Sequence, residues 1–202
     1  MAGIITGEDK AWEAIAALEP ADVCLRTGAG YDSDAGIYRL PAFGTWFAVD
    51  PWKRQISNLE PAGEVFLKRL RYFFVLSALW YMVKAADIRP SGSLVKPSGM
   101  TGGDIFFRGS HVLPLDAVAA RYGKDRQGFR EKAGSFRARK VPYGDAAAEF
   151  FPFPKIPVTV ILWLADEEWD ARADLLFDST ALSHLPIDVL WSVAMMTLLM
   201  LL

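Results

Sequence analysis

Alternation of apolar and polar residues predicts several short β-strands along this chain. Three of them, at residues 36–40, 45–49 and 54–59, follow one another with turn residues between them and have the pattern of a β-meander. A strongly apolar segment at residues 158–164 and its expected partner at residues 171–177 flank an acidic turn and indicate a β-hairpin. These segments predict antiparallel pairing, because each is joined to the next by a short turn.

Apolar residues at helical spacing predict four helices. The first covers residues 6–19, the second residues 61–86, the third residues 114–122 and the last residues 187–202. A further short strand is expected at residues 22–26, directly after the first helix. The helix over residues 61–86 is the longest and is expected to lie at the centre of the fold.

The order of these elements favours an α+β fold, because strands come in clusters rather than alternating with helices. The chain has 202 residues, of which 52% are hydrophobic, so it can bury a full core without disulfides or metals. It contains no internal repeat and no long linker. We therefore predict a single domain over residues 1–202, with a mainly antiparallel sheet, a long central helix and a C-terminal helix.

Composition narrows the functional classes. The net charge of −2 favours neither nucleic acid nor a membrane surface as a partner. Cys24 is the only cysteine, so one chain cannot build a disulfide framework, a zinc knuckle or a cysteine-ligated iron–sulfur cluster. The N-terminus lacks a basic segment followed by an apolar core, so we read no signal peptide and expect a cytoplasmic protein.

Two apolar runs, at residues 72–83 and 189–202, fall short of the roughly 20 residues that a membrane span needs. The first is expected to be a buried core helix. The second has no polar stripe and needs partners on more than one face. We expect residues 187–202 to lie in the core or to form a homo-oligomer contact, and we expect no membrane span.

Residues 101–114 hold the densest group of candidate site residues. Gly102 and Gly103 permit a sharp turn or a close approach to a ligand. A strand over residues 104–108 would then place Arg108 and His111 together at its end. Arg offers a bidentate fork for a carboxylate or phosphate, and His can ligate a metal or the iron or cobalt of a tetrapyrrole.

Two neighbouring features could complete such a site. Phe107 can stack on a planar ring, and the Pro/Gly/Ser-rich loop over residues 89–103, which begins at Arg89, has the length of a binding loop. The equally simple interpretation is structural: Arg108 and His111 then satisfy backbone carbonyls at a strand end.

The segment over residues 121–140 is strongly basic, with eight Lys and Arg residues against Asp125 and Glu131. Such a charge excess can attract an anionic ligand or an acidic partner, or can simply be a solvated surface. No nucleic-acid-binding motif accompanies it, so we expect no nucleic acid.

Acidic residues cluster in the turn of the predicted hairpin and just beyond it. Paired carboxylates can carry acid–base chemistry or hold a hard cation, but on a hairpin turn most of them would face water. Asp178 is the carboxylate most worth testing. The cluster comprises Asp166, Glu167, Glu168, Asp170, Asp174 and Asp178.

Several segments together resemble a family known only as domain of unknown function 3786, found mostly in anaerobic bacteria and archaea. The likeness extends over most of residues 10–195. The resemblance implies a complete folding domain in an anaerobic setting and no accepted activity. Some relatives carry an added cysteine-rich cluster domain, which these 202 residues with their single cysteine do not include. The residues that carry it are Tyr38 to Ile56, Lys84, Arg89 to Pro97, Gly102-Gly103, Phe106 to His111, Gly144 to Ala147, Ile156-Pro157, Trp163, Asp166 to Glu168 and Leu176 to Ser179.

We therefore expect a binding domain for a small anionic molecule or a tetrapyrrole-like cofactor such as heme or a corrinoid. One alternative is an enzyme that uses His111 with Asp178 or Asp145 as general acid and base. A second is an assembly or interaction subunit that uses residues 187–202. The residues expected to bind the ligand are Arg89, Gly102, Gly103, Phe107, Arg108 and His111.

Overall fold

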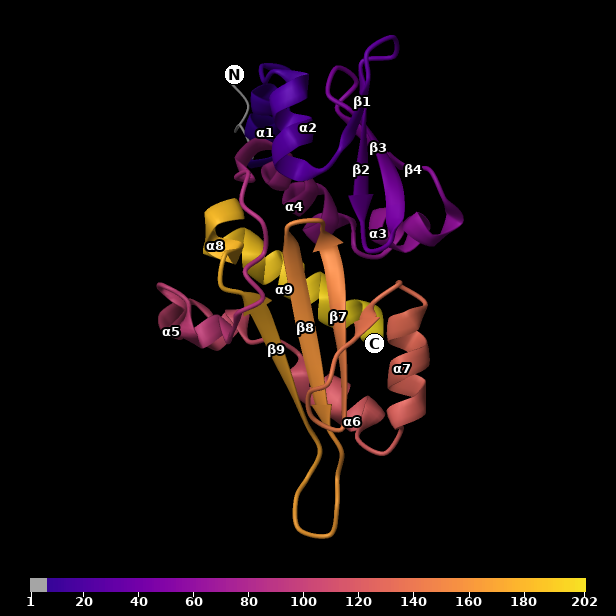
Figure 1. Cartoon of the computed structure of the whole chain (residues 1–202), viewed down its shortest axis with the longest axis vertical. Helices are drawn as coiled ribbons and strands as arrows, with labels where there is room; N and C mark the ends of the chain where they lie inside the picture. The colour runs from indigo at the N-terminus through magenta and orange to yellow at the C-terminus, as the bar shows by residue number, and fades with distance from the viewer. Residues whose placement is uncertain (1–6) are drawn as a thin grey trace.

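Two antiparallel sheets form the frame of this α+β protein in the computed structural model, which describes residues 7–202 (Figure 1). The first sheet is a meander in the order β1-β2-β3-β4, and the second has the order β5-β9-β8-β7-β6. The strands are β1 (Gly30–Asp32), β2 (Ile37–Ala42), β3 (Thr45–Asp50), β4 (Gln55–Asn58), β5 (Leu94–Val95), β6 (Arg139–Lys140), β7 (Ala146–Phe153), β8 (Ile156–Trp163) and β9 (Arg172–Asp178). The predicted meander and hairpin are thus confirmed.

Nine α-helices and three short 3-10 turns accompany the sheets among the described residues. None of the helices in that part of the chain is both long and apolar enough to cross a membrane. The helices are α1 (Gly7–Ala16), α2 (Pro20–Thr27), α3 (Glu64–Lys68), α4 (Arg71–Lys84), α5 (Gly103–Phe106), α6 (Leu115–Tyr122), α7 (Arg126–Gly134), α8 (Ala181–His184) and α9 (Ile187–Leu201), and the turns are η1 (Pro61–Gly63), η2 (Pro97–Gly99) and η3 (Gly109–His111).

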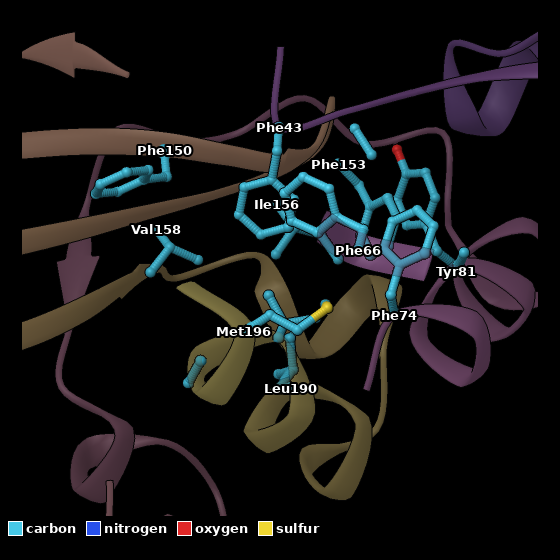
Figure 2. Close-up of a cluster of buried hydrophobic side chains, with 14 of the residues drawn as sticks. Phe43, Phe66, Phe74, Tyr81, Phe150, Phe153, Ile156, Val158, Leu190 and Met196 are labelled. Carbon is cyan, nitrogen blue, oxygen red and sulfur yellow. The ribbon is translucent and has the colours of Figure 1, made fainter. Parts of the chain in front are cut away.

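One hydrophobic core joins both sheets. Figure 2 shows Leu190 and Met196 of α9 pointing toward the strands β7 and β8, while Phe43 enters from the first sheet. Phe43 stacks on Phe66 of α3, and its backbone N–H donates to the carbonyl of Phe151 in β7. Helix α9 therefore needs no polar stripe: most of its circumference is buried against this core.

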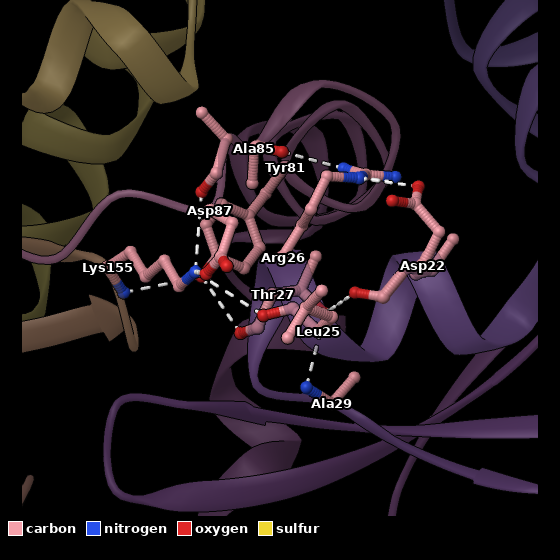
Figure 3. A network of polar contacts seen from close by, with 11 residues as sticks. Asp22, Leu25, Arg26, Thr27, Ala29, Tyr81, Ala85, Asp87 and Lys155 are labelled. Carbon is pink, nitrogen blue, oxygen red and sulfur yellow. Dashed lines mark hydrogen bonds and ion pairs between the residues drawn. The ribbon is translucent and has the colours of Figure 1, made fainter.

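Salt bridges and carbonyl contacts fix the junction of α2, α4 and the β7–β8 turn (Figure 3). The Lys155 Nζ lies 2.6 Å from Asp87 Oδ1 and also donates to the carbonyls of Leu25 and Ala86. Arg26 donates to the carbonyl of Ala85 and pairs with Asp22. These side chains satisfy carbonyl groups near the ends of two helices, which would otherwise lack partners.

Residues 22–26 form part of helix α2 and not the predicted strand. Pro20 occupies the first turn, where a missing N–H costs nothing, and Gly28 ends the helix with a φ of 74°. Val23 and Thr27, four residues apart, are the buried positions. The apolar run was too short for its period to separate strand from helix.

The single central helix predicted over residues 61–86 is also wrong in detail, because the segment is divided into η1, α3 and α4. The break falls at Leu70, whose φ of −110° and ψ of 13° leave the helical region while its side chain remains buried. The first predicted helix is seen as α1, and residue 6 lies outside the described residues.

Candidate functional site

The predicted strand over residues 104–108 is absent from the structure, which has helix α5 followed by the turn η3 there. Gly102 adopts a φ of 77°, and the Cα of Gly103 lies so close to the carbonyl of Pro97 that an added Cβ would be 1.8 Å from that oxygen. The two glycines therefore make a sharp turn against η2. Their role in this arrangement is to fold the loop on itself.

His111 is held between aromatic side chains. Its ring stacks on Phe106 at a centroid distance of 4.4 Å and meets Trp191 of α9 edge-on at 5.1 Å. The Trp191 Nε1 donates to the backbone carbonyl of His111 at 3.0 Å. The α5–η3 segment is thereby fastened to the C-terminal helix.

These rings belong to a longer line of contacting aromatic side chains, which we call the aromatic row. Trp191 meets Phe73 of α4 at 5.7 Å, Phe73 meets Tyr72 at 5.3 Å, and Phe106 meets Phe107 at 5.7 Å. Each such pair contributes about 0.5–1.5 kcal/mol beyond burial of its area. The row consists of Tyr72, Phe73, Trp191, His111, Phe106 and Phe107.

The aromatic row lies at the surface. Tyr72 is 77% exposed, and the other five rings are partly exposed. Two aliphatic side chains beside the row are also in water: Ile105 is 77% exposed and Val112 is 62% exposed. Large apolar residues that lie together in this way mark interaction surfaces more often than isolated ones do.

A hollow of about 720 Å³ adjoins the row at Tyr72. Three of the side chains that line it are basic and one is acidic, so we call it the basic hollow. Lys68 pairs with Glu64, and Glu8 accepts a hydrogen bond from Trp12 at 3.3 Å. The lining residues are Gly7, Glu8, Lys68, Arg69, Arg71, Tyr72 and Leu76.

The remaining predicted ligand residues do not gather at one point. Arg89 is exposed on the loop between α4 and β5, and Arg108 is exposed between α5 and η3. Figure 1 shows α5 beyond one edge of the five-stranded sheet and α7 beyond the opposite edge, so the α7 part of the basic segment lies far from α5. Of the predicted site residues, the structure joins Phe107 and His111 in the aromatic row.

Asp178 is buried and accepts hydrogen bonds from several donors. The backbone N–H of Gly92 lies 2.7 Å from one carboxylate oxygen, and the Thr180 hydroxyl lies 2.7 Å from the other. Burial acts to raise the pKa of this carboxyl, but hydrogen bonds from Thr180, Ser91 and Gly92 outweigh it and hold the pKa below its ordinary value. Asp178 thus ties the loop after α4 to the end of β9.

The structure does not pair His111 with either carboxylate proposed for acid–base chemistry. His111 contacts Phe106 and Trp191, whereas Asp178 accepts hydrogen bonds from Ser91, Gly92 and Thr180. Asp145 accepts from the backbone N–H of Leu164 at 2.8 Å and lies 3.8 Å from Arg126. Within residues 7–202 no three His, Cys, Asp or Glu side chains are placed to hold a metal ion.

The acidic turn between β8 and β9 projects well beyond the second sheet (Figure 1). Its backbone is ordered by Asp166, whose Oδ1 accepts from the N–H groups of Glu168 and Trp169. All residues over 166–170 are exposed, and Trp169 is 73% exposed. We call residues 166–170 the acidic tip.

Sequence reasoning missed Tyr72 and Phe73 as surface residues, and it offered Trp191 only as part of the segment over residues 187–202. All three lie in apolar runs that predict buried helices, and most of their neighbours in those helices are indeed buried. The sequence did contain one signal, the basic residues Lys68, Arg69 and Arg71 just before Tyr72. A helix that passes from a basic, solvated surface into the core leaves the residues at that boundary partly in water.

The fold and this surface define an α+β protein whose two antiparallel sheets share one core and whose C-terminal helix supports an exposed row of rings. The chain belongs to the family described as Domain of unknown function (DUF3786), whose model matches residues 19–200. The resemblance inferred from the sequence is thereby confirmed. No curated protein and no solved structure matches the chain.

Proposed function

We propose that this protein is an interaction domain whose aromatic row and basic hollow together bind an apolar, acidic segment of a partner protein. The observation that carries the proposal is the row itself: six contacting rings from four separate elements, all partly or largely exposed. Aromatic side chains dominate the energetic centres of protein interfaces.

Charge complementarity supports an acidic occupant. Arg69 and Arg71 line the basic hollow, and Arg108 is exposed at the other end of the row, beside Phe107. A partner that buries the rings would bring its own side chains against these guanidinium groups. Carboxylates would form charge-assisted hydrogen bonds there, whereas Lys or Arg would be repelled.

A pair of synthetic probes tests this proposal. One is a fluorophore-labelled peptide in which Trp alternates with Glu, and the other alternates Trp with Lys. Fluorescence anisotropy should detect binding of the Glu peptide, and Arg69→Glu/Arg71→Glu should weaken it by about tenfold or more. Tyr72→Ser should also weaken binding, because it removes an exposed ring without disturbing the core.

Trp52→Ser supplies the matched control, since Trp52 is another exposed ring but lies in the β3–β4 turn, apart from the row. It should leave binding unchanged. Equal binding of both peptides, or binding that Tyr72→Ser and the charge reversal leave intact, would rule the proposed surface out. Circular dichroism of each variant checks that the fold is retained.

Binding of heme, a corrinoid or another small anionic molecule stays a prediction, as do an anaerobic setting, a cytoplasmic location and acid–base catalysis by His111. An absorption spectrum of anaerobically purified protein, together with its native mass, tests the first of these. A tetrapyrrole band or a fixed excess mass that His111→Ala abolishes would favour the cofactor over the interaction domain.

A further inference from the structure

We infer that the acidic tip of one copy of this chain docks on the aromatic row and basic hollow of a second copy. The inference rests on the proposed function of that surface and names its occupant. It joins two features that lie in separate parts of the molecule.

The acidic tip has the chemistry that the proposed surface requires. Trp169 is flanked by Asp166, Glu167, Glu168 and Asp170, so one exposed ring is surrounded by carboxylates. The Oδ1 of Asp166 accepts hydrogen bonds from the backbone N–H of Glu168 at 2.9 Å and of Trp169 at 2.7 Å, and these bonds stabilise the turn. A preformed turn loses less conformational entropy on binding than a flexible segment does.

The aromatic row and the basic hollow complement the acidic tip both in aromatic packing and in charge. Trp169 can pack against Tyr72 and the neighbouring rings, which offer aromatic faces and edges. Glu167 and Glu168 can then approach Arg69 and Arg71 in the basic hollow. All four charged side chains are exposed in the free molecule, so their pairing costs little desolvation and should be sensitive to salt.

The geometry of the single chain favours contact between copies. In Figure 1 the tip extends from the end of the second sheet far from helices α1 and α4, whose residues line the hollow. The tip lies at the opposite end of the molecule from the hollow formed by Gly7, Tyr72 and Leu76 and does not contact it in the same chain. A second molecule can bring the two together.

The test is a charge-exchange experiment on the full chain, followed by sedimentation velocity. The wild-type protein should self-associate as its concentration rises, and added salt should weaken the association. Glu167→Lys/Glu168→Lys and Arg69→Glu/Arg71→Glu should each reduce it by about tenfold or more when studied alone. An equimolar mixture of the two variants should associate again, because the reversed charges at positions 167 and 168 of one variant can then pair with the reversed charges at positions 69 and 71 of the other.

Asp34→Lys/Glu131→Lys is the matched control, since it reverses two exposed carboxylates that lie outside both features, and it should associate like the wild type. A wild-type chain that stays monomeric at every concentration would overturn the inference. So would a mixture of the two reversed variants that fails to associate.

The inference and the proposed function can fail separately. If the wild type is monomeric but the Trp/Glu peptide still binds, the surface is an interaction site and its partner is another protein. If the peptide fails to bind as well, both ideas are wrong. If self-association is unaffected by either charge reversal, the copies meet elsewhere and the docking contact is excluded.

Discussion

At the scale of single residues, His184 is a buried titratable group with an unusual environment. Its side chain is 1% exposed, and neither ring nitrogen has a hydrogen-bond partner within the part of the chain that the structure describes. Burial and then the nearby Lys155 ammonium lower its pKa below the ordinary value of 6.5, while the Asp178 carboxylate and the Ala86 carbonyl act in the opposite direction. At neutral pH the folded protein therefore favours the neutral imidazole.

We predict that His184 makes the protein less stable in mild acid. As pH falls below 6.5, the unfolded chain binds a proton that the folded chain resists, so the free energy of unfolding decreases until the lowered pKa is passed. Urea unfolding at neutral pH and in mild acid should show this loss. His184→Phe should show a smaller loss, and an equal loss in both proteins would contradict the assignment.

Asp178 contributes through its hydrogen bonds, and its pH window lies lower. Because its pKa is held below 3.8, the stability it provides is present above that pH and is lost as pH falls through the lowered value. Asp178→Asn places an amide NH2 among donor groups, so we expect a loss of about 1–3 kcal/mol in the free energy of unfolding. Faster hydrogen exchange at Ser91 and Gly92 should accompany it.

The control for this variant is Asp174→Asn. Asp174 pairs with Lys96 at 2.9 Å and accepts from Trp163, but it keeps more contact with water than Asp178 does. Its replacement should cost less than that of Asp178. An equal loss in the free energy of unfolding for the two substitutions would show that burial of the Asp178 carboxylate does not increase its contribution to stability.

At the scale of elements, the attachment of α5 and η3 to α9 depends on Trp191. Trp191→Phe keeps an aromatic ring but removes the donor to the His111 carbonyl. We predict faster hydrogen exchange in residues 103–113, with a change in global unfolding of about 1 kcal/mol or less, because the core side of α9 is untouched. A loss of protection throughout the molecule would mean that this contact belongs to the core.

The elements also show where local sequence was sufficient. The strands β2, β3, β8 and β9 were predictable, because side-chain alternation, the short apolar run of β8 and the turns between strands are all local signals. Residues 104–108 were not, since Ile and two Phe residues favour a strand while the turn at Gly102 and Gly103 requires contact with Pro97. Local preference there gives way to a packing constraint that period counting cannot detect.

At the scale of the whole molecule, helix α9 forms one side of the hydrophobic core. We predict that a chain truncated after Pro186 does not fold, because Leu190, Val193 and Met196 are fully buried against both helices and strands. Loss of the cooperative thermal transition and of near-ultraviolet circular dichroism would confirm this. A truncated chain that keeps its transition and loses only self-association would instead make α9 an interface helix.

In the candidate site, too, some residues can be identified from the local sequence and others only from the fold. His111 and Phe107 were identified as candidates from the local sequence alone, because a His beside aromatic residues can be recognised within one short segment. Trp191, which contacts His111, and Phe73, which contacts Trp191, come from helices far away in sequence, so only the fold could bring the rings into one row. Helix α7 of the basic segment is close to His111 in sequence and yet lies at the opposite edge of the second sheet from α5.

The sequence by itself determined the α+β class, the antiparallel hairpins and the family. These follow from hydrophobic periodicity and turn residues, which act over short distances along the chain. Only the tertiary structure decided that residues 61–86 break into separate helices, that Asp178 holds a loop and that six rings share one surface. Those features depend on contacts between residues distant in sequence, and no local preference specifies such contacts.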